Sequence, residues 1–363
     1  MTQFHRQYAE GCMLGLACGD ALGTTLEFTT PRGLPSYPEL VSGPHRDVEG
    51  GGPFKVAKGQ VTDDTMMAVA LARSLRQADG FMPAHIANEY QAWRRVTFDI
   101  GSTTSGALER IARGVPATVG GQATWESSQA NGSLMRCAPI GVYYATHPHL
   151  IAHTAAAESA ITHSNPHCML ACAAFCAAIG AAVRDDRGEG KSELEQRRVA
   201  MLEAAMNAID DVADTCKSRD DERFVENLHQ ASEAIREDVM VGVRGPSPVD
   251  DGRFDMHKYQ GFVRVALRLA FYHLLRTDSF ESALIDVVNR GGDADTNGAI
   301  VGALLGALHG IYAIPLQWRK AVIEARASSS FSDDQRDAFD HRFHPRRILE
   351  FVTAVELKEW DVR

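Results

Sequence analysis

Two apolar segments of this 363-residue chain carry glycine at every fourth position, near the start and near residue 300. The glycines are Gly11, Gly15, Gly19 and Gly23 in the first segment, and Gly298, Gly302, Gly306 and Gly310 in the second. Inside a helix each glycine costs about 1 kcal/mol relative to alanine, so four in one helix require a compensating gain. Residues four apart share a helix face, and a stripe without side chains lets a neighbouring helix approach closely. We therefore predict that both segments are central helices packed at a short distance.

Helical periodicity also dominates the rest of the chain, whereas alternating strand patterns are scarce. The segment 52–59 would form a short β-ribbon at most. We therefore predict an all-α fold. Helices are expected over residues 8–23, 64–78, 83–95, 103–113, 150–162, 166–184, 192–213, 221–237, 258–276, 279–289, 296–312 and 333–340.

Residues 1–363 are expected to form a single domain with two unusual segments. Residues 28–60 are rich in glycine and proline, and structureless loops of this length are usually functional lids or disordered. We predict a lid-like loop there. Residues 185–257 are polar and charged, and we predict that they form a helical insertion at the surface.

Composition narrows the classes of partner. The net charge of −10 argues against nucleic acid as the main ligand, because such proteins usually carry a basic face. It leaves room for a phosphate-bearing small molecule, which helix N-termini and local arginines can bind. The first residues lack the pattern of a signal peptide, and the longest apolar run, 299–314, is shorter than the ~20 residues of a membrane span. We expect a cytoplasmic protein that binds neither nucleic acid nor a membrane.

Seven cysteines occur, and none pairs in a Cys-x-x-Cys motif. Cys168, Cys172 and Cys176 recur every fourth residue, so they lie on one face of a predicted helix. Sulfur ligation of a metal is one interpretation, but we favour buried free thiols, since free cysteine is among the most buried residue types.

Clustered acids precede two of the predicted apolar helices. The first cluster has Thr62, Asp63 and Asp64, and the second has Asp293, Asp295 and Thr296. Asp and Thr are common N-caps, and acids are favoured near a helix N-terminus, so separate caps remain an alternative. Capping, however, does not account for two neighbouring acids, whereas oxygen ligands suit hard ions such as Mg²⁺ or Mn²⁺. We expect the two clusters to hold two divalent cations, with the helix ends keeping the carboxylates ionised, and Gly291 and Gly292 to let the loop wrap around the metal.

Further polar residues accompany these clusters. Asp20 lies inside an apolar helix, where burial is costly unless the acid is bonded, and we expect it to bond a loop backbone. Glu27 is placed on the lid, and Asp99 is either an N-cap or a functional acid. In the segment 131–136, glycine-flanked amides and Arg136 would suit phosphate oxygens, although an ordinary turn is favoured. His163 precedes a turn and is as readily structural.

Six segments in order resemble the signatures of one known family. They read "GCMLGLACGDALG…EF", "GQVTDDT", "FDIGSTT", "NGSLMRCAPIG", "THSNP" and "NRGGDADTNGAIVGALLGA", and together they span most of the chain from Gly11 to Gly310. Each motif alone is weak, but six in sequence are specific. The chain is identified on this basis as a member of the ADP-ribosylglycohydrolase family.

The resemblance implies a compact all-α domain with a binuclear Mg²⁺ or Mn²⁺ centre in a cleft. By motif match, the metal ligands would be Thr62, Asp63, Asp64, Asp293, Asp295 and Thr296. The catalytic acids near the reacting ribose would be Asp99 and Glu27, with Asp99 preferred as the general acid/base. The ADP-ribose groove would be lined by Asn131, Gly132, Ser133, Met135 and His163.

The expected function is hydrolysis of ADP-ribose from modified protein side chains, with arginine as the first choice of linkage. Serine or O-acetyl linkages are alternatives within the same chemistry. Two other classes stay open: a catalytically silent ADP-ribose-binding protein, and an immunity protein that blocks an ADP-ribosyltransferase toxin by contact as well as by hydrolysis. The expected partners are therefore an ADP-ribosylated protein and, in the last case, the toxin.

Overall fold

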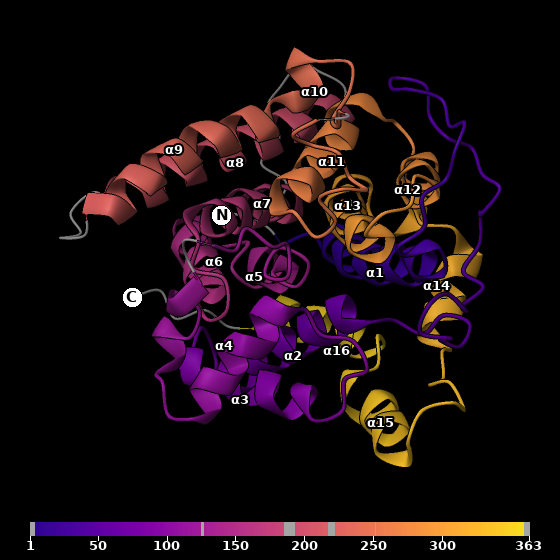
Figure 1. Ribbon diagram of the computed structural model, residues 1–363, viewed down its shortest axis with the longest axis horizontal. Coiled ribbons are helices and arrows are strands. Elements are labelled where there is room, and N and C mark those ends of the chain that lie inside the picture. The colour runs from indigo at the N-terminus through magenta and orange to yellow at the C-terminus, as the bar shows by residue number, and fades with distance from the viewer. Residues whose placement is uncertain (1–3, 125–126, 185–192, 217–221, 251, 359–363) are drawn as a thin grey trace.

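The structure is a computed structural model, and it describes residues 4–124, 127–184, 193–216, 222–250 and 252–358 (Figure 1). Its helices are α1 (Arg6–Gly23), α2 (Asp63–Gln77), α3 (Pro83–Arg94), α4 (Ser102–Ala112), α5 (Ala138–Tyr143), α6 (Ile151–Ala160), α7 (Pro166–Arg184), α8 (Glu193–Cys216), α9 (Glu222–Val239), α10 (Val241–Arg244), α11 (Val263–Arg276), α12 (Phe280–Asn289), α13 (Ala294–His309), α14 (Leu316–Ile323), α15 (Asp333–Ala338) and α16 (Arg347–Glu356). In the described residues, β-pairing is limited to two isolated bridges, one of which joins Val56 of the predicted ribbon to Gly51 just before it. The all-α prediction is confirmed.

The predicted helix boundaries agree with the structure to within three residues, with one exception, and the predicted starts at residues 192 and 221 lie outside the described residues. The helix expected to begin at residue 258 begins at Val263. Asp255 stops it from starting earlier, because its carboxylate accepts hydrogen bonds from the backbone N–H groups of His257 and Lys258 and shapes a turn. The short helices α5, α10, α14 and α16 were not predicted, since four to ten residues give little periodicity to detect.

Helices α1 and α13 lie side by side through the centre of the molecule (Figure 1). Their glycine stripes face each other, so that backbone meets backbone. A Cβ placed on Gly298 would lie 2.5 Å from the carbonyl oxygen of Gly19, and one on Gly15 would lie 2.9 Å from the carbonyl carbon of Gly302. Alanine cannot fit at either position without separating the helices, which confirms the prediction of a close glycine seam.

The loop 28–60 is tied to helix α12. The Asp286 carboxylate accepts a hydrogen bond of 2.9 Å from the Tyr37 hydroxyl. The guanidinium of Arg290, paired with Asp286 at 2.8 Å, donates to the backbone oxygen of Glu39 at 3.0 Å. These buried, charge-assisted bonds hold the middle of the loop against the protein body.

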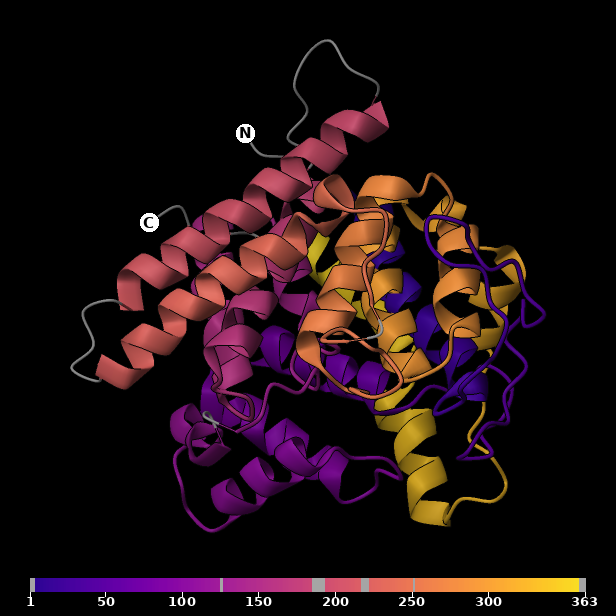
Figure 2. The same cartoon turned by 45° about the horizontal axis from the view of Figure 1, so that its top comes forward.

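Helices α8 and α9 form an antiparallel pair that extends beyond the body of the protein (Figure 2). They lie in the predicted insertion 185–257, of which residues 185–192, 217–221 and 251 lie outside the described part of the chain. Helix α8 packs along α7, and α9 is held to the core where Asp238 accepts a hydrogen bond of 2.9 Å from Arg264 on α11. Both side chains are fully buried, so this ion pair fixes the base of the insertion.

Helix α7 is long and apolar enough to cross a membrane by length and composition, but 94% of its apolar window is buried inside the protein. Its apolar surface therefore packs against neighbouring helices. Cys168, Cys172 and Cys176 lie on it as buried free thiols, as the sequence predicts.

Candidate active site

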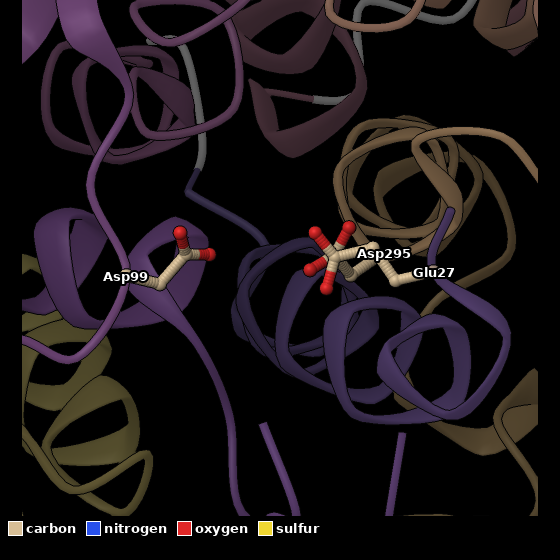
Figure 3. A group of neighbouring side chains, drawn as sticks. All are labelled: Glu27, Asp99 and Asp295. Carbon is tan, nitrogen blue, oxygen red and sulfur yellow. The ribbon is translucent and has the colours of Figure 1, made fainter. Parts of the chain in front are cut away.

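Five carboxylates from distant parts of the chain line one cavity of about 290 Å³: Glu27, Asp63, Asp99, Asp293 and Asp295. The N-termini of α2 and α13 both open onto this cavity, which brings the two predicted acid clusters together. Oxygens of Glu27, Asp99 and Asp295 lie within 4.8 Å of one another. Figure 3 shows Asp99 directed from one wall toward the neighbouring side chains of Glu27 and Asp295.

Helix α2 is capped by an acid from another helix. Asp20 of α1 is fully buried, and its carboxylate accepts hydrogen bonds from the backbone N–H of Thr62 at 3.0 Å and of Thr65 at 3.1 Å. The expectation that Asp20 bonds a loop backbone is confirmed. Because Asp20 satisfies these amides, Asp63 and Asp64 are released from the capping role that was the main alternative for them.

The turn before α13 depends on its two glycines. Gly291 and Gly292 have φ angles of 73° and 69°, a region that residues with a Cβ adopt at a cost. A Cβ on Gly292 would also lie 2.8 Å from the backbone oxygen of Met256. The tight turn aims Asp293 at the cavity, where its Oδ2 accepts a hydrogen bond of 2.7 Å from the Asn131 amide.

The predicted metal ligands fall into two layers. Asp63, Asp293, Asp295 and Thr296 line the cavity, whereas Thr62 and Asp64 lie fully buried beneath it, joined by a hydrogen bond of 3.0 Å from the Thr62 hydroxyl.

Two carboxylate oxygens of the site, Oδ1 of Asp64 and Oε2 of Glu27, are buried without a hydrogen-bond partner among the described residues. An unpaired buried carboxylate oxygen is costly, and a divalent cation is the ligand that would satisfy it. The donor set, oxygen throughout, therefore fits Mg²⁺ or Mn²⁺.

The electrostatics of the site also favour a bound cation, although one expectation about them was wrong. We expected the helix ends to keep the acids of the two clusters ionised. Burial instead raises the pKa of Asp295 well above its ordinary value, with repulsion from Glu27 adding to it. Burial, reinforced by the charge of Asp99, also raises the pKa of Glu27, which lies outside the two clusters, to about 8. Burial and crowding outweigh the helix ends in the protein alone, and bound cations would reverse this balance.

The predicted groove residues Asn131, Gly132, Met135 and His163 also line the cavity. Ser133 lies behind its wall, fully buried, and its hydroxyl accepts a hydrogen bond of 2.9 Å from Ser159. The Ser133 side chain therefore supports the wall from behind.

Arg136 does not offer its side chain to a phosphate. Its guanidinium is fully buried and paired with Glu158 at 2.8 Å, which corrects the idea that it receives phosphate oxygens. It instead donates a hydrogen bond of 2.8 Å to the Thr162 hydroxyl, and that hydroxyl lies 2.7 Å from Nδ1 of His163.

This chain of bonds holds the His163 ring in place. The Thr162 oxygen accepts from Arg136, and it can either donate its proton to Nδ1 of His163 or accept from Nδ1–H through its second lone pair. Burial and the charge of Arg136 lower the pKa of His163 to about 3, so the ring is neutral and carries a single N–H.

Several lining residues escaped the sequence analysis. Phe28 lies at the edge of the cavity, and Gln260 and Gly261 line it from the segment before α11. Gln260 and Gly261 fall inside the helix predicted over 258–276, so the wrong boundary hid them. Phe28 directly follows Glu27, and this position next to a predicted catalytic acid was the only feature of the sequence that could have indicated its place in the site.

Comparison with known proteins finds similarity to one family over almost the whole chain. A family model described as ADP-ribosylglycohydrolase matches residues 1–346. The chain is 32% identical over 316 residues to the ADP-ribosyl-dinitrogen reductase glycohydrolase of Rhodospirillum rubrum, covering 85% of this chain and 88% of that protein. It is 30% identical over 328 residues to the ADP-ribosylarginine hydrolase Tri1 of Pseudomonas putida, covering 86% and 74%. The solved structure of an ADP-ribosylglycohydrolase-related protein complex matches 97% of each chain with a TM-score of 0.65 at 27% identity.

Proposed function

This chain belongs to the ADP-ribosylglycohydrolase family and is a glycohydrolase, and from that premise we propose that it releases ADP-ribose from modified arginine side chains in a reaction that needs two divalent cations. The single observation that carries the proposal is the meeting of five carboxylates in one cavity. The name of the Pseudomonas putida relative, an ADP-ribosylarginine hydrolase, supports arginine as the linkage.

The cations would be Mg²⁺ or Mn²⁺. Asp63, Asp64, Asp293 and Asp295 would hold them, with Thr62 and Thr296 beside them. The unpaired oxygen of Asp64 and the raised pKa values of these buried acids are the features that a cation explains. When bound, such ions orient the hydroxyls of a ribose and lower the pKa of a bound water.

Asp99 and Glu27 supply proton transfer. Carboxylate oxygens of Asp99 lie within 4.8 Å of those of Glu27 and Asp295, and burial raises the pKa of Asp99 above its ordinary value. Asp99 is our preferred general acid/base, and Glu27 is the second candidate. Cleavage of a glycosidic bond develops positive charge on the sugar ring, and ionised carboxylates around the cavity stabilise that charge.

The opposite wall would bind the rest of ADP-ribose. In the tautomer that we propose, Nδ1 of the neutral His163 ring accepts from Thr162 and Nε2–H is free to donate to the ligand. Asn131 is held in place by its bond to Asp293. Because both groups are oriented before the ligand arrives, they lose little freedom on binding.

The test incubates the protein with arginine-, serine- and O-acetyl-linked ADP-ribose, each with and without Mg²⁺ or Mn²⁺. We expect metal-dependent release from arginine, and Asp295→Ala to lower the rate by about a hundredfold or more while leaving the helical circular dichroism unchanged. The control is Asp337→Ala, whose side chain is 78% exposed. Near-normal hydrolysis by Asp295→Ala defeats the proposal, and protection against a toxin by that inactive variant would indicate action by contact.

A further inference from the structure

Phe28 combines three properties that rarely coincide. It lines the cavity, its side chain is 55% exposed, and its φ angle is +60°. A positive φ is a genuine outlier for a bulky side chain, and an exposed ring gains little from the hydrophobic effect. The ring makes no ring–ring contact with any described aromatic residue. Folding alone therefore does not account for phenylalanine here.

The backbone at Phe28 is held in this conformation from the ligand turn. Its N–H donates a hydrogen bond of 2.7 Å to the backbone oxygen of Gly292, and the N–H of Gly292 donates one of 2.9 Å to the oxygen of Thr29. Strained backbone of this kind persists only where the surroundings over-determine it, and it gathers at functional sites. The two bonds fix where the ring stands relative to Asp293.

The backbone of Phe28 lies next to the reacting acids, because it follows Glu27 and is bonded to Gly292, which precedes Asp293. Glu27, its neighbour in the chain, is 6% exposed and lies within 4.8 Å of Asp99 and Asp295. The groove residues Asn131 and His163 come from other segments. Phe28 therefore contacts the acceptor side chain, which is the group joined to the ribose at the bond that is cleaved.

The chemistry of the acceptor distinguishes the linkages. An ADP-ribosylated arginine keeps a positive, planar guanidinium, whereas a serine O-glycoside and an acetyl ester are neutral at the linkage. The face of an aromatic ring attracts a cation, and a guanidinium stacks on it. Resting on the proposed function, we infer that Phe28 is a specificity-determining residue that stacks on the guanidinium of the modified arginine.

The experiment compares wild type with Phe28→Leu, which keeps apolar bulk without the aromatic face, and Phe28→Tyr, which keeps the face. We expect Phe28→Leu to lower kcat/KM for the arginine linkage by about threefold to thirtyfold, and Phe28→Tyr to stay within about twofold of wild type. Hydrolysis of any serine or O-acetyl linkage and the affinity for free ADP-ribose should stay within about twofold in both variants. Tyr312→Leu, at a residue that is 81% exposed, is the control for loss of a surface aromatic ring.

Equal losses on all linkages, or weaker binding of free ADP-ribose by Phe28→Leu, overturn the inference and indicate a structural role or stacking on adenine. A wild type that cleaves serine or acetyl linkages but not arginine also overturns it. A wild type that cleaves no linkage defeats the proposed function instead.

In that case the binding of agmatine, a small guanidinium compound, tests the role of Phe28. With ADP-ribose present, wild type should bind agmatine at least about threefold more tightly than its neutral urea analogue, and Phe28→Leu should lose that preference. Equal agmatine binding by the two proteins overturns the inference.

Discussion

Replacing Gly15 with alanine tests the packing of α1 against α13. The added Cβ would lie 2.9 Å from the carbonyl carbon of Gly302 and 3.3 Å from the Cα of Gly306, with the Gly302 oxygen closer still. Non-bonded carbons rest at about 3.5–4.0 Å. The helices must therefore separate by roughly 0.6 Å or more (3.5 less 2.9). Neither side can yield by rotating a side chain, because both are backbone.

The cost follows from this geometry. Overpacking costs typically about 1–3 kcal/mol, and two rigid helix backbones place Gly15→Ala at the upper end, about 3 kcal/mol. Alanine returns about 1 kcal/mol through its helix propensity, which leaves a net loss of about 2 kcal/mol. At about 2.1 cal/mol/K per residue over 363 residues, this loss lowers Tm by about 3 °C.

Thermal unfolding followed by circular dichroism measures the change, with urea unfolding as a second assay. The matched control is Gly106→Ala in α4, where the nearest atom to an added Cβ is Nη1 of Arg110 at 3.5 Å. That variant should gain up to about 1 kcal/mol from helix propensity alone. If Gly15→Ala unfolds at or above the wild-type temperature, or if both variants shift in the same direction, the close-contact argument is wrong.

Three further predictions concern the site. Saturating Mg²⁺ or Mn²⁺, at about a hundred times its Kd, should raise Tm by about 3–4 °C for each ion bound. Asp295→Asn should lose most of this shift, measured by differential scanning calorimetry; an equal shift in both proteins would contradict the ligand assignment. In EDTA, stability should fall as pH rises from about 4.5 to about 8, because folding raises the pKa of Glu27 to about 8 and the folded state holds the proton longer; Glu27→Gln should flatten that slope, and an unchanged slope would refute the attribution. Thr162→Val should weaken ADP-ribose binding by about threefold to tenfold, because Nδ1 of His163 loses the hydroxyl that orients the ring. Thr162→Ser, which keeps the hydroxyl, should match wild type by titration calorimetry; equal losses in the two variants would exclude a role for the hydroxyl.

The central helices and the acid clusters were predictable for a physical reason. A helix repeats every 3.6 residues, so glycine at every fourth position marks a face, and only close packing explains four of them. Acids before apolar helices likewise stand out locally. Asp20 was recognisable because an acid inside an apolar helix needs a partner.

What escaped prediction depends on long-range geometry. Arg136 and Ser133 belong to a recognised motif, but whether each side chain faces the cavity or the wall depends on the turn that carries it. Gln260 and Gly261 line the site because Asp255 forms a turn before them, so that α11 begins only at Val263. The raised pKa values arise from burial and mutual repulsion, neither of which a linear sequence displays.

The attachment of loop 28–60 to α12 has a mechanical consequence. Arg290 grips the loop through the backbone oxygen of Glu39, and Asp293 follows only three positions later. Because only two residues separate Arg290 from Asp293, the loop and the acids of the site can move very little relative to one another. A bound partner, an antibody or a substitution that displaces the loop near Glu39 would therefore displace Asp293 directly, without any rearrangement of the helices between them.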